Sequence, residues 1–169
     1  MVLRERVAAD VDGCVALARR THETDRYPMH IPDDLRLFIV TPDALAAWVA
    51  VEDGEIVGHV ALRPRAGPSA TALASEALGL DPDHLGVVSR LLVSPEHRRM
   101  GIGRSLLELA CDEAWARGRW PVLDVVTFQH AAIRLYESCG WVRAGQVTSR
   151  FGQGPEVEEF VYLGPRPAA

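Results

Sequence analysis

The stretch 91-LLVSPEHRRMGIGRSLLELA-110 joins an apolar, strand-like run to a helix-like run. Between them lie basic residues and two glycines, Gly101 and Gly103, that flank a single residue. The first backbone N–H groups of a helix lack partners within it, and together with the helix dipole they attract anions. A glycine also lets an anion approach the backbone closely, because it has no Cβ. The stretch therefore predicts a loop that binds phosphate or pyrophosphate, with charge-assisted donors at Arg98, Arg99 and Arg104.

Two familiar phosphate-binding motifs do not fit this loop. A P-loop requires a Lys-Ser/Thr pair after its last glycine, whereas Arg104 and Ser105 follow Gly103 here. The dinucleotide fingerprint requires a small residue at its sixth position, which Leu106 occupies. Taken alone, the two glycines also fit a tight turn with solvated arginines beside it.

Length and composition indicate one globular domain. The chain has 169 residues, is 48% hydrophobic and carries a formal net charge of −5. We predict a single domain over 1–164, with an insertion at 65–85 between the third and fourth strands and a loose tail at 165–169. The acidic balance argues against a nucleic-acid partner. No apolar run approaches the roughly 20 residues of a membrane span, so we expect no membrane partner either.

The cysteines and histidines show no pairing pattern. Three cysteines without paired spacing argue against a disulfide framework and predict reduced thiols in a cytoplasmic protein. The six histidines form neither an HxxxH nor an HExxH pattern, so no metal site is expected.

Hydrophobic periodicity predicts a mixed α/β chain. Asp53-Gly54, between two apolar runs, is a strong hairpin signal. Hairpins combined with strand–helix–strand units predict one mixed sheet with helices on both faces. The expected strands are 2–7, two within 46–64, 86–93, 121–126, 141–150 and 156–163. The expected helices are 11–24, 34–40, 71–80, 101–117 and 129–139, of which 71–80 is a short helix inside the insertion.

Two motifs carry a resemblance to a known family. The segment 98-RRMGIG-103 matches the R/Q-x-x-G-x-G/A signature of the GNAT superfamily of acetyl-CoA-dependent N-acetyltransferases. A second motif of that superfamily, A-x-x-L-Y-E-x-x-G-W/F, is matched by 132-AIRLYESCGW-141. The resemblance implies a central mixed, largely antiparallel sheet of about seven strands that splays between the fourth and fifth strands. About four helices would cover both faces of that sheet.

The same resemblance implies that acetyl-CoA is the cosubstrate. Its pyrophosphate would lie on the backbone of residues 98–105, and its pantetheine arm would pair with the fourth strand like an added strand. Gln129 stands where the family often has asparagine. The implied acetyl-CoA contacts are Leu91, Leu92, Val93, Arg98, Arg99, Met100, Gly101, Ile102, Gly103, Arg104, Ser105, Gln129, Ala132 and Tyr136.

Tyr136 is the catalytic candidate. By resemblance its hydroxyl would protonate the departing thiolate, whereas the alternative is a core tyrosine with a satisfied hydroxyl. An alkylammonium acceptor must lose a proton before it attacks, and the tetrahedral oxyanion needs a donor, expected from the backbone near Leu92 or Val93. The fourth strand, 86-GVVSRLLV-93, lacks the carboxylate base that many family members carry. The candidates for the base or for an acceptor contact are His59, His84, Asp124 and His30, each of which also fits a structural or exposed residue.

The function that follows is direct acetyl transfer, in a ternary complex, from acetyl-CoA to a primary amine of a small molecule or peptide. A non-catalytic acyl-CoA-binding sensor on the same fold is the alternative. Carboxylates in 25-DRYPMHIPDD-34 and in the last hairpin, at Glu156, Glu158 and Glu159, would attract a cationic amine or form a solvated acidic surface. Four tryptophans leave room for a homodimer interface.

Overall fold

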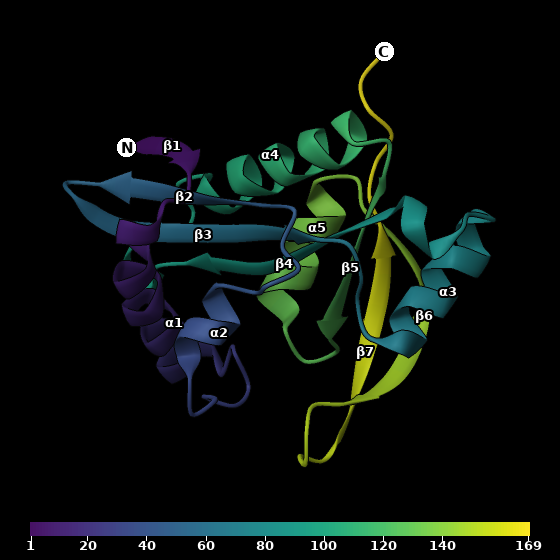
Figure 1. Ribbon diagram of the computed structural model, residues 1–169, viewed down its shortest axis with the longest axis horizontal. Coiled ribbons are helices and arrows are strands. Elements are labelled where there is room, and N and C mark those ends of the chain that lie inside the picture. Colours follow the sequence, from purple (N-terminus) through teal and green to yellow (C-terminus); the bar gives the residue numbers. More distant parts are fainter. The chain divides into compact units, whose positions relative to one another are not determined.

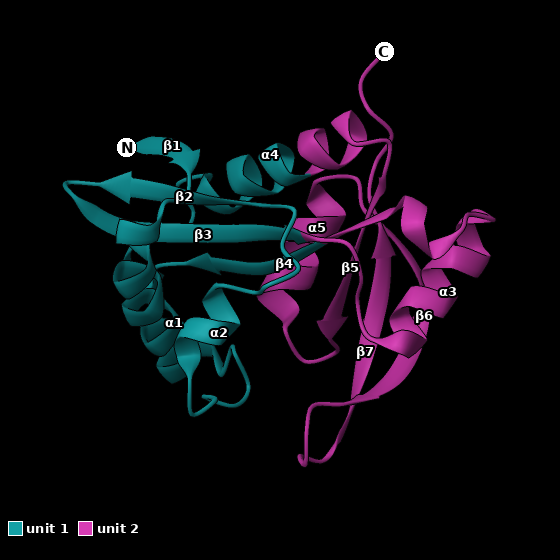
Figure 2. Ribbon diagram, viewed as in Figure 1, with its two compact units in different colours: residues 1–62, 88–110 teal, residues 63–87, 111–169 magenta.

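The computed structural model describes residues 1–169, which divide into two compact units (Figure 2). Unit 1 comprises residues 1–62 and 88–110, and unit 2 comprises residues 63–87 and 111–169. The strands belong to one seven-stranded sheet in the order β1-β2-β3-β4-β5-β7-β6 (Figure 1). The strands are β1 (Val2–Glu5), β2 (Ala46–Glu52), β3 (Glu55–Arg63), β4 (Leu85–Val93), β5 (Trp120–Val126), β6 (Val142–Arg150) and β7 (Glu156–Leu163). The helices are α1 (Val11–Asp25), α2 (Leu35–Ile39), α3 (Pro68–Leu78), α4 (Ile102–Ala116) and α5 (His130–Ser138).

This order confirms the predicted fold class, a mixed and largely antiparallel sheet with helices. The resemblance implied about four helices, whereas the structure has five; the additional one is α3, the helix expected within the insertion at 65–85. Pro68 stands in the first turn of α3, where its missing N–H leaves no bond unmade. Gly79 ends the helix in the left-handed conformation that favours glycine.

In unit 1, β1, β2 and β3 form an antiparallel meander. Asp53 and Gly54 link β2 and β3 and both have positive φ, 49° and 81°, as the predicted two-residue hairpin turn requires. A bulge between Ala50 and Val51 shifts the register of β2 against β3. The sequence signal therefore located this turn correctly.

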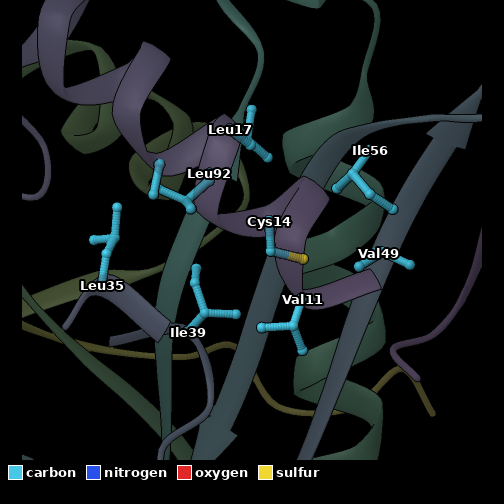
Figure 3. Close-up of a cluster of buried hydrophobic side chains, with 9 residues drawn as sticks. Val11, Cys14, Leu17, Leu35, Ile39, Val49, Ile56 and Leu92 are labelled. Carbon is cyan, nitrogen blue, oxygen red and sulfur yellow. The ribbon is translucent and has the colours of Figure 1, made fainter. Parts of the chain in front are cut away.

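The two faces of this part of the sheet carry different helices. α1 and α2 pack on one face and bury a cluster that includes Cys14, Leu17, Ile39, Val49 and Leu92 (Figure 3). The start of α4 packs on the other face, where a Cβ built on Gly58 would lie 2.9 Å from side-chain atoms of Ile102 and Leu106. The absence of a side chain at position 58 thus allows α4 to approach the sheet closely.

In unit 2, the first residues of β4 pair with β5 in parallel, from Leu85–Trp120 to Val87–Val122. β5, β7 and β6 continue antiparallel. α3 covers the face that carries Val122 and Val161, whereas α5 places the Tyr136 ring against Tyr162 on the opposite face. The polar side chains of unit 2 can therefore be assigned either to the face covered by α3 or to the face covered by α5.

Several sequence predictions remain predictions. They are the splay of the fourth and fifth strands, the single domain with its loose tail, and the homodimer. No helix of the protein combines the length and the apolar character that a bilayer-spanning segment needs. The cytoplasmic location also stays a prediction.

Candidate active site

The predicted anion loop, residues 98–105, has the backbone that its glycine motif requires. Arg99 and Gly101 both adopt positive φ, 62° and 80°, and a Cβ built on Gly101 would meet nothing within 4 Å. α4 begins immediately afterwards at Ile102, and the Ser105 N–H donates to the Gly101 carbonyl over 3.0 Å, which closes the first turn. The exposed loop is therefore followed at once by a helix start, the arrangement that favours a bound anion.

Arg98, at the start of the anion loop, is held by an acidic side chain. Its guanidinium donates to both carboxylate oxygens of Asp25, the last residue of α1. Arg99, Met100 and Arg104 are exposed. The loop thus presents three exposed cations, of which Arg98 is oriented by Asp25.

The segment before the anion loop is anchored to the sheet. The Ser94 N–H donates to the Val57 carbonyl over 2.8 Å, and the Ser94 hydroxyl donates to Glu96, which lowers the pKa of that carboxyl. His97 Nε2 lies 3.0 Å from a carboxylate oxygen of Glu52 in β2. These contacts fix where the loop leaves β4.

The predicted fourth-strand contacts follow a break in regular strand geometry. Arg90 has φ +55°, the only left-handed residue within β4. After it, Leu92 is buried in the unit 1 core, whereas Leu91 and Val93 are half-buried. The predicted pantetheine strand is therefore interrupted by one residue in the left-handed conformation.

His59, one predicted base, is fully buried with both ring nitrogens engaged. Nδ1 lies 2.8 Å from the Arg90 carbonyl and Nε2 lies 3.0 Å from Arg6 Nη1. Burial lowers the pKa of His59 to about 4, and the charges of Arg6 and Arg90 act in the same direction. This environment suits a neutral histidine that holds backbone rather than one that exchanges protons with a substrate. His30, and His84 in the short 3-10 turn Pro82–His84, are both exposed.

Asp124, another predicted base, lies beside a buried glutamate. Glu159 of β7 is opposite Val126 of β5, so Asp124, two residues before Val126, is on the same face of the sheet as Glu159. Glu159 is only 3% exposed and its Oε1 has no hydrogen-bond partner. Burial is the main cause that raises the pKa of Glu159 to about 7, and the charge of Asp124 adds to it. A hydrogen bond from Ser149 of β6 acts in the opposite direction.

The sequence analysis assigned Glu159 only to an acidic surface of the last hairpin. Its burial depends on the pairing of β7 with both β5 and β6, which is set by residues distant in the sequence. The only local signal was alternation along 156-EVEEFVYL-163, where position 159 shares its face with Val157 and Val161.

Tyr136 lies on the opposite face of the unit 2 sheet from Glu159. Its side chain is 8% exposed, and its ring centroid is 6.2 Å from those of Trp141 and Tyr162. Gln129 stands at the N-terminal cap of α5 and its N–H donates to the Val126 carbonyl. Ala132, on the first turn of α5, is half-buried. The second motif therefore forms the predicted helix with Tyr136 on its buried side.

No group of three or more His, Cys, Asp and Glu side chains is placed to hold a metal ion. The chemistry open to these residues is anion binding in unit 1 and proton transfer through a carboxyl pair and a tyrosine in unit 2.

The fold is one that N-acetyltransferases share. The structure of the ribosomal-protein-S18-alanine N-acetyltransferase from Escherichia coli matches with a TM-score of 0.69 and 19% identity, covering 99% of this chain and 95% of that one. NAA60 from Arabidopsis thaliana, in complex with acetyl-CoA, matches with a TM-score of 0.71 and 17% identity, covering 96% of each chain. At such identities the likeness shows the fold alone.

The sequence comparisons identify the family. A family model described as Acetyltransferase (GNAT) family matches residues 13–141, and the chain belongs to this family. N-acetyltransferase family 8 member 3 from Rattus norvegicus is 36% identical over 100 residues. That match covers 59% of this chain and 39% of the rat protein, so only a minor part of the relative is represented. This family membership confirms the predicted resemblance to the GNAT superfamily.

Proposed function

We propose that the protein is an N-acetyltransferase that moves an acetyl group from acetyl-CoA to a primary amine of a small molecule or peptide. The observation that carries the proposal is the pairing of half-buried Asp124 with buried Glu159, whose Oε1 has no hydrogen-bond partner and whose pKa lies near neutrality. A group that accepts a proton in a reaction works best when its pKa lies near the working pH. A sensor that only binds acyl-CoA has no use for such a pair, which favours the enzyme.

Unit 1 supplies the cosubstrate loop in this proposal. The open backbone at Gly101, the first turn of α4 and the cationic side chains of Arg99 and Arg104 form a cradle suited to a pyrophosphate. The cradle lies in a protein of net negative charge, which suits a compact anion rather than a polyanion. Acetyl-CoA, the cosubstrate of N-acetyltransferases, carries such a pyrophosphate.

Unit 2 supplies the proton acceptor. An alkylammonium, with a pKa of about 10.4, must lose a proton before its nitrogen lone pair attacks the thioester carbon. We assign that proton to the carboxyl pair, whose anionic form also attracts the cation. The nitrogen–carbon bond then forms, the nitrogen releases its second proton to solvent, and the carbon–sulfur bond breaks to give the amide and the thiolate. The carboxyl pair afterwards returns its proton to solvent.

Tyr136 is assigned as the proton donor to the departing thiolate. Amine and sulfur are separate substituents of one tetrahedral carbon, so one group can accept the amine proton while another protonates the sulfur. Tyr136 and Glu159 lie on opposite faces of the same sheet, and this separation supports distinct roles for them. The tyrosine regains its proton from solvent after the thiol leaves.

Binding and turnover test the proposal in that order. Titration calorimetry with acetyl-CoA, with dephospho-CoA and ATP as controls, should show binding that weakens when Gly101 is replaced by valine. A panel of primary amines and short peptides should then release free thiol from acetyl-CoA, and Tyr136→Phe should slow this release without loss of acetyl-CoA binding. Folded protein that fails to bind acetyl-CoA would refute the proposal. Binding without turnover of any amine would favour the sensor.

A further inference from the structure

Arg90 is a left-handed residue in the middle of a strand. Its φ of +55° lies in a region that is unfavourable for a residue with a Cβ. Such residues persist only where neighbouring groups hold them, and they concentrate at functional sites. The adjacent Ser89 carries a buried hydroxyl that no protein group partners. The question is what holds Arg90 in this conformation.

The carbonyl of Arg90 is held by a defined histidine tautomer. A guanidinium can only donate, so the 3.0 Å contact from Arg6 Nη1 makes His59 Nε2 an acceptor. The ring hydrogen is then on Nδ1, which donates to the Arg90 carbonyl over 2.8 Å. Arg6 Nη1 also donates to the Ile39 carbonyl over 2.5 Å. His59 is fully buried, so this relay is shielded from water.

The side chain of Arg90 is held at the same time from α2. Its Nε donates to the Phe38 carbonyl over 3.1 Å, and its guanidinium lies 4.1 Å from the centroid of the Phe38 ring. One residue is therefore fixed through its carbonyl by β3 and through its side chain by α2. These contacts hold residue 90 in the left-handed conformation, although the extended conformation of a regular strand has the lower intrinsic energy.

We propose that His59 and Arg6 lock the left-handed turn at Arg90 so that the backbone after it stays aimed at the acyl carbonyl, which makes His59 a positioning residue. This inference rests on the proposed function, because the acyl group gives the turn its purpose. A left-handed residue reverses the following peptide unit relative to the regular ladder. In this proposal, the peptide unit that follows Arg90 faces the acyl carbonyl of the cosubstrate instead of a neighbouring strand.

Substitutions at position 90 distinguish the effect of the left-handed backbone conformation from the effect of the arginine side chain. Arg90→Gly accepts positive φ and should keep kcat within about tenfold of wild type. Arg90→Val opposes positive φ and should lower kcat about 100-fold, the loss typical of one misplaced oxyanion donor, with the acetyl-CoA Kd within about threefold. His59→Leu should resemble Arg90→Val. The chemical shifts of residue 90 in nuclear magnetic resonance spectra report whether the left-handed conformation survives.

Asp53→Val is the matched control. Asp53 also has positive φ, 49°, but lies in the exposed β2–β3 hairpin. A valine there introduces the same backbone strain into unit 1, at a different position. It should lower the melting temperature as Arg90→Val does and keep kcat. His59→Gln, which retains one donor and one acceptor, should recover part of the activity that His59→Leu loses and guards against a variant that fails to fold.

The outcomes separate the inference from the proposed function. If Arg90→Val or His59→Leu loses the left-handed conformation yet keeps wild-type kcat, the positioning role is wrong and acetyl transfer stands. Equal loss of kcat in Asp53→Val would reduce the effect to general destabilisation and also overturn the inference. Wild-type protein that neither binds nor turns over acetyl-CoA would remove the proposed function, and this inference with it.

Discussion

His59 of unit 1 and Glu159 of unit 2 are both buried titratable residues within the sheet, yet their surroundings differ in kind. His59 has a partner on each ring nitrogen, and burial lowers its pKa to about 4. Glu159 has an oxygen without a partner, and burial raises its pKa to about 7. In both cases burial opposes the charged form. The histidine is thereby kept out of proton exchange near neutral pH, whereas the glutamate is brought into it.

The comparison teaches how to tell a positioning residue from one that handles protons. Burial alone does not decide, since both side chains are almost inaccessible. What decides is whether the protein itself satisfies the polar atoms of the group, because an unsatisfied buried atom costs free energy and usually has a purpose. By this criterion, substitution of Glu159 should impair proton transfer, whereas substitution of His59 should disturb the backbone geometry that it holds.

The largest expected effect is on turnover. Glu159→Gln should lower kcat about 10²–10⁴-fold, the range for loss of a general base. Glu158→Gln is the matched control, since Glu158 is exposed and bonded to Gln146 and Thr148. Assays of acetyl-CoA turnover with the best acceptor of the amine panel measure both. Equal activity of the two variants would remove Glu159 from the mechanism.

Stability should depend on pH in opposite directions at the two residues. The folded-state pKa of His59 lies below 6.5, so its contribution is complete above pH 6.5 and is lost as the pH falls toward 4. The folded-state pKa of Glu159 lies above 4.5, so its contribution is complete below pH 4.5 and is lost as the pH rises through 7. Each difference is linked to about 3 kcal/mol of unfolding free energy.

Urea unfolding at pH 4, 6 and 8 measures these two contributions. His59→Leu should flatten the loss of stability between pH 6.5 and 4 relative to wild type. Glu159→Gln should gain stability at pH 8 relative to wild type, because no buried carboxylate has to ionise. If both variants show the same pH dependence of unfolding free energy as the wild type, the contrast between His59 and Glu159 is contradicted.

A smaller effect is expected in the pH dependence of the rate. If Glu159 must be ionised, kcat at saturating substrates should rise about tenfold per pH unit below pH 7 and level off above it. Asp124→Asn removes one cause of the raised pKa, so the remaining activity should reach its plateau at lower pH. A profile that is flat between pH 5.5 and 8 would exclude Glu159 as the proton acceptor.

The smallest effect concerns the anion loop. Gly101→Ala should cost about 1 kcal/mol of stability, because a side chain at φ +80° is strained even where space is open. It should also weaken acetyl-CoA binding several-fold. Gly79→Ala is the control, because Gly79 has φ +65° and open space at the end of α3. Calorimetry that finds the same acetyl-CoA affinity for both variants would argue against the loop as the cosubstrate site.

The sequence predicted what local signals encode. The Asp53-Gly54 turn, the start of α4 after Gly101 and the helix around Tyr136 all follow from residues close together in the chain. Those signals, together with the two motifs, were enough for the fold class and the family.

The sequence did not predict the features that depend on contacts between residues far apart in the chain. Arginine does not signal positive φ, so the turn at Arg90 depends on His59 and Phe38, residues distant in the chain. Likewise, Glu159 resembles its exposed neighbour Glu158 until the β5–β7 register assigns them to opposite faces. Both features came from long-range contacts and were visible only in the structure.

The bidentate contact between Asp25 and Arg98 has a consequence for how a ligand would be received. A long basic side chain loses up to roughly 2 kcal/mol of conformational entropy when it is ordered. Asp25 orders Arg98 as the protein folds, so a ligand meets a side chain whose freedom is already reduced. The carboxylate also competes for the guanidinium, so it offsets part of the attraction for an anion. Asp25 therefore weakens the attraction of Arg98 for an anion and, at the same time, reduces the entropy that Arg98 loses when an anion binds.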